Sequence, residues 1–168
     1  MQERIAKLLR FLYQIEAVLA SVAYAIAAGI LLYDVVSREL GQESYLGAQK
    51  IAVFGTIIAA FLGLSLATAA GRHLKPAFVK AWVPSSWDPI MERLSNIVSA
   101  LIYIVLAIYG IDFVLQSIEY DDKVAVLRWQ LWPFRIVLPV AFAMSALRHS
   151  CFAIWPGLTP VPEEGQVE

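Results

Sequence analysis

The chain has 168 residues, of which 60% are hydrophobic and only 16% charged, and its net charge is −1. Soluble domains carry about 25% charged residues, and a single soluble core of this size could not bury so many apolar side chains. The composition therefore predicts a membrane protein. The near-zero net charge provides no overall field that would attract nucleic acid or an acidic ligand.

The first long apolar segment covers residues 11–33, and Glu16 is the only charged residue inside it. A segment with three basic residues, 1–10, precedes it. The tripeptide at residues 23–25 has the small-residue pattern of a signal-peptide cleavage site. The apolar run continues past that site through residues 29–32, which is long for a secretion signal. We therefore expect an uncleaved transmembrane anchor.

The second apolar segment covers residues 51–71 and contains no charged residue. Small residues recur in it every four positions, and such stripes allow helices in lipid to approach each other closely. We expect this stripe to serve packing inside the protein, with contact to a partner protein as the alternative. Its members are Gly55, Ala59, Gly63 and Ala67.

The connection that follows has a helical repeat of apolar residues, at Leu74, Ala77, Phe78, Ala81 and Trp82. A proline two residues into this stretch suits a first helical turn, and Pro84 would end the helix. The pattern predicts a short amphipathic helix that lies on the membrane surface. A plain basic loop is the alternative.

The third apolar segment covers residues 94–118 and contains one acid, Asp112. The fourth covers residues 131–155 and includes Arg135 and Pro139 in its first half. It can span a bilayer if the arginine extends its charged end to the interface. Tryptophans flank this segment as they flank transmembrane helices, at positions 129, 132 and 155.

These segments predict an all-α membrane protein with four transmembrane helices and a short interfacial helix between the second and third spans. The expected organisation is a basic cytoplasmic N-terminus (1–10), one transmembrane domain (11–155) and a disordered cytoplasmic tail (156–168). Cys151 is the only cysteine. It cannot form an internal disulfide, so we expect a small buried apolar residue.

Four spans would place both termini on the same side of the membrane. That side would hold eight lysines and arginines, against five on the other. The positive-inside rule therefore predicts cytoplasmic termini. The eight are Arg4, Lys7, Arg10, Arg72, Lys75, Lys80, Arg93 and Arg148, and the five are Arg38, Lys50, Lys123, Arg128 and Arg135.

Three acids lie at or near membrane depth, where charged groups are functional candidates. Asp34 lies four residues before Arg38, a spacing that predicts a local ion pair on a helix. Asp112 fits the outer interface, and the role of Glu16 stays open. The chain contains no phosphate-binding loop, metal-spaced cluster or nucleophile motif, so we expect neither an enzyme nor a resident cofactor.

Both histidines fall at the expected cytoplasmic ends of spans, where His73 is next to Arg72 and His149 is next to Arg148. Haem between helices usually needs two histidines at matching depth that face one another. We expect both histidines to be solvated at helix ends instead, with haem ligation as the alternative.

Several short stretches together resemble the small membrane subunit of tripartite ATP-independent periplasmic (TRAP) transporters. The first span closes with an arginine in residues 34–38, and the second ends with residues 61–63 and then 71–74, which include a histidine. Residues 132–133 and 138–142 are similar to the fourth span of that family. The chain departs from the family pattern at residues 49–50, 75–76 and 141.

The resemblance implies an accessory subunit in the bacterial inner membrane. Its partners would be a large multi-span subunit that moves substrate by an elevator motion, and a periplasmic protein that captures an organic acid. Sodium ions would bind the large subunit rather than this chain. The residues to which we assign structural or partner-contact roles are Arg38, Gly55, Ala59, Gly63, Ala67, Arg72, His73, Trp82, Arg135 and Pro139.

Two other classes of protein remain as alternatives. Small multidrug exporters also have four spans and an acid in the first, so Glu16 would bind proton and cation in turn within a dimer. Those exporters have tight loops, whereas this chain has a long connection from Arg72 to Arg93. The other alternative is a haem or quinone anchor of a redox complex.

Overall fold

The computed structural model describes residues 2–41, 47–71 and 87–160. In this part of the chain, four helical segments are long and apolar enough to cross a membrane. The protein is therefore an all-α membrane protein with four spans, as predicted. The predicted interfacial helix, with Arg72, His73 and Trp82, lies outside the described residues. The helices are α1 (Gln2–Glu39), α2 (Ala48–Ala69), α4 (Asp88–Glu119), α5 (Trp132–Arg135), α6 (Val137–Ile154) and the 3-10 turn η2 (Pro156–Leu158).

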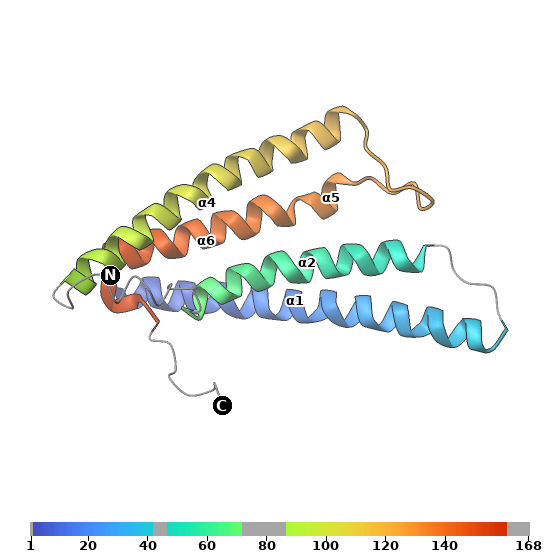
Figure 1. Ribbon diagram of the computed structural model, residues 1–168, viewed down its shortest axis with the longest axis horizontal. Coiled ribbons are helices and arrows are strands. Elements are labelled where there is room, and N and C mark those ends of the chain that lie inside the picture. The colour runs from blue at the N-terminus through green and yellow to red at the C-terminus, as the bar shows by residue number, and fades with distance from the viewer. Residues whose placement is uncertain (1, 42–46, 72–86, 161–168) are drawn as a thin grey trace.

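The spans form two antiparallel hairpins that lie side by side, α1 with α2 and α4 with α6 (Figure 1). Extensive contacts join α1 to α2, α2 to α6 and α6 to α4, so the helices form an open row. The two hairpins converge at the end that holds the start of α1 and the end of α6, and they separate toward the other end (Figure 1). Because α6 lies in the middle of the row, half (50%) of the residues in the most apolar 18-residue stretch of the fourth span are buried, against 11% in that of the edge helix α4.

A single face of α1 packs against the rest of the protein. Residues that are buried or partly buried recur along it every three or four positions, as one stripe of an α-helix requires. The other faces remain apolar, with Val18 62% and Leu32 65% exposed. Lipid is a suitable environment for those side chains, so the helix needs no protein cover there.

The helices extend past the apolar runs that the sequence displays. With a rise of about 1.5 Å per residue, α1 is about 57 Å long, whereas the hydrocarbon layer is about 30 Å thick. Its first turns are rich in Gln, Glu, Arg, Ala, Lys and Leu, which are strong helix formers in water. The predicted span 11–33 is thus the apolar middle part of a longer helix.

Two glycines allow close contacts between neighbouring helices. A Cβ added at Gly55 would lie 2.9 Å from the Ala23 carbonyl oxygen of α1 and 3.0 Å from the Ala27 Cβ. At Gly110 on α4, an added Cβ would lie 3.2 Å from three atoms of Pro139. Each hairpin therefore contains a contact that leaves little or no room for a larger residue.

Pro139 also explains why the fourth span begins as two pieces. Proline has no backbone N–H, so it cannot donate to the carbonyl of Arg135, four residues earlier. The helix is interrupted at Ile136, and α6 continues from Val137, which places the proline in the first turn of α6. Hydrogen bonds on either side of the interruption, such as Ile136 N to Trp132 O at 3.1 Å, keep the two pieces together.

The connection between α4 and α5 is a compact hydrogen-bonded loop. Lys123 and Gln130 form an isolated antiparallel bridge, and the side chains of both donate to the Asp121 carboxylate, at 2.5 and 2.8 Å. The hydrogen bond from Lys123 lowers the pKa of Asp121 most, followed by the one from Gln130. Val126 has a φ of 76°, which is unfavourable for a β-branched residue, and its side chain is 63% exposed.

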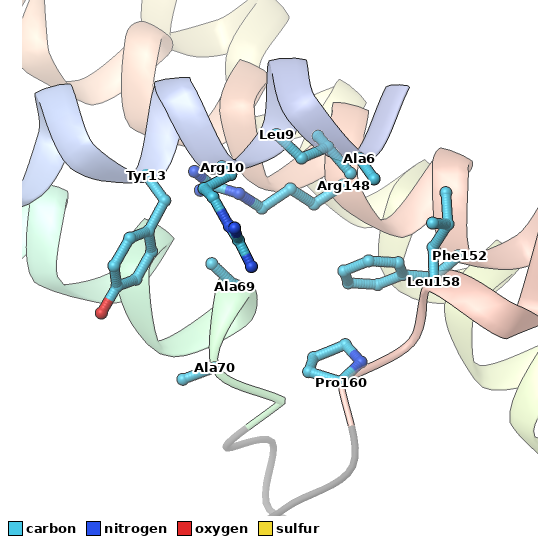
Figure 2. A pocket seen from close by; sticks show the side chains of 10 residues that line it. All are labelled: Ala6, Leu9, Arg10, Tyr13, Ala69, Ala70, Arg148, Phe152, Leu158 and Pro160. Atoms are coloured by element: carbon cyan, nitrogen blue, oxygen red, sulfur yellow. The ribbon is translucent and has the colours of Figure 1, made fainter. Parts of the chain in front are cut away.

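A partly open cavity of about 380 Å³ lies at the end where the hairpins converge (Figure 2). The first turns of α1, the end of α2 and the segment from α6 to Pro160 surround it. Figure 2 shows the Arg10 side chain extending from α1 into this space, above Ala69.

Candidate functional site

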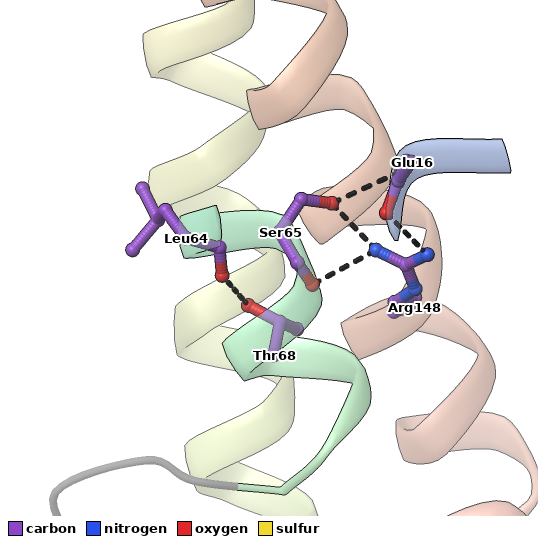
Figure 3. Close-up of polar contacts among 5 residues, drawn as sticks. All are labelled: Glu16, Leu64, Ser65, Thr68 and Arg148. Carbon is purple, nitrogen blue, oxygen red and sulfur yellow. Dashed lines mark hydrogen bonds and ion pairs between the residues drawn. The ribbon is translucent and has the colours of Figure 1, made fainter. Parts of the chain in front are cut away.

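Three polar side chains from three different helices meet inside the protein (Figure 3). We call Glu16, Ser65 and Arg148 the buried polar centre. The Arg148 guanidinium donates from Nη2 to Glu16 Oε2 at 2.7 Å and from Nη1 to the Ser65 carbonyl and hydroxyl oxygens, at 2.9 and 2.5 Å. The Ser65 hydroxyl donates in turn to Glu16 Oε1 at 3.2 Å.

The polar centre is almost completely shielded from solvent, with exposures of 5% for Glu16, 0% for Ser65 and 1% for Arg148. An isolated charge at the centre of a transmembrane helix costs about 2.5–3.5 kcal/mol on translocon-based scales. Here the two charges compensate each other, and hydrogen bonds use both carboxylate oxygens. Because α1 and α2 belong to one hairpin and α6 to the other, the ion pair fastens the two hairpins together.

A second polar contact joins α6 to its own hairpin partner, α4. His149 Nδ1 lies 2.9 Å from Asn96 Oδ1, and the imidazole stacks on Tyr103 with ring centroids 5.6 Å apart. Both His149 and Asn96 are buried. The adjacent residues 148 and 149 of α6 thus make polar contacts with different hairpins.

These findings correct the sequence-based interpretation of Arg148 and His149. We expected His149 to be solvated at a helix end and counted Arg148 among the basic residues on the cytoplasmic side, but they are only 2% and 1% exposed. Ala153 and Ile154 extend α6 beyond them, and the segment as far as Pro160 follows, so these two positions lie inside the protein. Without Arg148, the count of basic residues on the side of the termini falls from eight to seven, which still exceeds five.

Sequence reasoning missed Ser65, Asn96 and the pairing partner of Glu16. The sequence contained a weak signal. Glu16 lies near the start of span one and Arg148 near the end of span four, and these two ends are on the same side of the membrane when there are four spans. Ser65 lies among small residues and gives no sign of its role. Pairing across 132 positions cannot be inferred without knowing that α2 and α6 are neighbours.

The predicted local ion pair between Arg38 and Asp34 is present, and Asp34 is buried while Arg38 is half exposed. Arg135 donates to the Asp122 carboxylate at 2.6 Å, and its guanidinium lies 4.2 Å from the centroid of the Phe113 ring. It is therefore held by partners from the end of α4 and the loop after it.

The small-residue stripe of α2 is not one continuous packing face. Gly55 is buried against α1, whereas a Cβ added at Gly63 would meet no atom within 4 Å. Ala59 and Ala67 are only partly buried. The buried positions of α2 follow another stripe, consisting of Ala48, Ala52, Gly55, Leu62, Ser65 and Thr68.

The structure also describes two other candidate residues, Cys151 and Asp112. Cys151 is buried, as expected of a small apolar residue. Asp112 accepts a hydrogen bond from Gln116 at 2.8 Å on the exposed side of α4. The described residues contain no group of three His, Cys, Asp or Glu side chains that could hold a metal ion. Haem ligation stays untested, because His73 lies outside the described part of the chain.

One protein-family model matches residues 27–154, which include the last part of α1 and all of α2, α4, α5 and α6. That family is described as tripartite ATP-independent periplasmic transporters, DctQ component. Searches of curated proteins and of solved structures found no match. Ser65 and Arg148 fall inside the matched residues, and Glu16 precedes them.

Proposed function

The chain belongs to the DctQ family of TRAP transporter components, and we propose that it is the small accessory subunit of such a transporter. Its role would be to bind the large membrane subunit and to enlarge the static part against which the elevator moves. The open row of helices suits this role, because its edge helices α1 and α4 have long apolar faces that no other part of the described chain covers.

The main support for the proposal is that the buried charges of Glu16 and Arg148 pair with each other inside the protein. Both carboxylate oxygens of Glu16 are engaged by Ser65 and Arg148, so the ion pair at membrane depth holds helices together. A carboxylate that binds proton and cation in turn must exchange partners during each cycle. The contacts of Glu16 therefore favour an accessory subunit over a self-sufficient exporter.

We further propose that the chain is in the bacterial inner membrane with both termini in the cytoplasm. The excess of basic residues in the sequence on the side where the first span begins and the fourth span ends supports this orientation. The opposite end, with the loop of residues 120–131, would then face the periplasm. There it would help dock the protein that delivers an organic acid for sodium-driven uptake.

Reconstitution into liposomes tests the proposal. With an inward sodium gradient and a set of radiolabelled carboxylic acids, liposomes that contain this chain alone should take up none of them. Uptake should appear after the large subunit and the periplasmic binding protein are added. Uptake by this chain alone would contradict an accessory role, and so would full uptake by the other two components without it.

A further inference from the structure

The cavity at the converging end of the hairpins combines apolar walls with cationic side chains. Its apolar lining includes Leu9 and Tyr13 of α1, Phe152 of α6 and Leu158. Arg10 and Arg148 are the charged residues that line it. Figure 2 shows the Arg10 guanidinium between Ala69 and the Phe152 ring, pointing away from its own helix.

The two arginines differ in how their charges are compensated. Arg148 is paired with Glu16 in the buried polar centre. Arg10, by contrast, makes no hydrogen bond or ion pair with any residue in the described part of the chain. The lining therefore carries one net positive charge, on a side chain with free N–H donors. A guanidinium in this state matches the geometry of a phosphate group.

We propose that this cavity binds an anionic membrane phospholipid, with its phosphate on Arg10 and the start of an acyl chain against Leu9 and Phe152. The location selects a lipid over a dissolved anion. α2 ends at Ala69 and α6 at Ile154, so the cavity lies where spans end and lipid headgroups begin. It is also bordered by α1, an edge helix of the row whose exposed face is apolar and therefore suited to lipid.

The volume of the cavity agrees with this occupant. About 380 Å³ accommodates a headgroup and the adjoining glycerol rather than a whole lipid. Since the cavity is partly open, the remainder of both acyl chains would lie along the outer face of α1. The binding would connect the first turns of α1 to α2 and α6 at the same end as the buried polar centre.

Native mass spectrometry of the detergent-solubilised protein tests the inference, with phosphatidylglycerol as the probe. We expect a one-to-one adduct with phosphatidylglycerol, no such adduct with diacylglycerol, and no displacement by millimolar inorganic phosphate. Arg10→Gln should weaken the phosphatidylglycerol adduct about tenfold, as expected for the loss of a charged hydrogen bond. Ala6→Phe should weaken it as well, because the added ring would occupy the cavity without changing its charge.

Arg4→Gln is the matched control, since it removes the same charge from α1 at a position that does not line the cavity. It should leave the adduct unchanged, and circular dichroism should confirm that all variants remain folded. Equal binding by the wild type, Arg10→Gln and Ala6→Phe would overturn the proposal. So would displacement by inorganic phosphate, which would show a site for a free anion rather than for a lipid.

Discussion

Glu16→Gln and Arg148→Met should each destabilise the protein far more than Ser65→Ala, which removes an uncharged group from the same buried polar centre. Either change leaves the other charge buried without its counter-ion, a situation that costs about 3–5 kcal/mol. Ser65→Ala removes only a hydroxyl, and hydrogen bonds between transmembrane helices average about 0.6 kcal/mol in double-mutant cycles. The Ser65 carbonyl remains available to Arg148 in that variant. The ion pair, rather than the hydroxyl, should therefore dominate.

The double variant Glu16→Gln/Arg148→Met leaves no unpaired charge. Its loss of unfolding free energy should be smaller than the sum of the two single losses, with a coupling energy of about 2–3 kcal/mol. The assay is unfolding by SDS in mixed micelles, followed by far-ultraviolet circular dichroism. Arg4→Gln, at an exposed position of the same helix, is the control and should change stability little. Single losses below about 1 kcal/mol that simply add would refute the role assigned to the ion pair.

Three further changes test the packing and the loop by the same unfolding assay. Gly55→Ala should cost about 1–3 kcal/mol, because the new methyl would meet the backbone of α1 at 2.9 Å, whereas Gly63→Ala meets nothing within 4 Å and should cost almost nothing. Equal costs would contradict the packing described for α2. Asn96→Leu should cost up to about 1.7 kcal/mol through the lost contact with His149, and a stabilised variant would contradict that role. Val126→Gly should stabilise the protein by about 0.5 kcal/mol, since glycine accepts a φ of 76° without strain, and a loss would show that this side chain makes a contact of its own.

The sequence predicts the spans well because lipid imposes one strong condition, a continuous apolar run with no unsatisfied backbone groups. It also predicts the Asp34–Arg38 pair, which depends only on helical spacing. The packing of the spans against one another is harder to predict, because apolar residues that face lipid resemble those that face another helix. The sequence therefore does not show which helices are neighbours. The Glu16–Arg148 pair and the packing surface of α2 were hidden for that reason. Arg148 in particular has the sequence context of a helix end and acquires its role only when α6 lies against α2.

The small-residue stripe illustrates the same limit at a single position. Gly55 and Gly63 are equivalent in the sequence pattern, yet only Gly55 lies where α1 approaches α2 closely. The difference arises from the way the hairpin packs, which a four-residue period does not encode.

The most direct test of an accessory role is to identify what this chain binds in its native membrane. The protein would be tagged at its C-terminus, purified in mild detergent and analysed by mass spectrometry together with the proteins that co-elute. We predict stoichiometric recovery of one large multi-span membrane protein. Recovery of this chain alone, as a stable dimer in several detergents, would contradict the account and favour a self-sufficient small exporter.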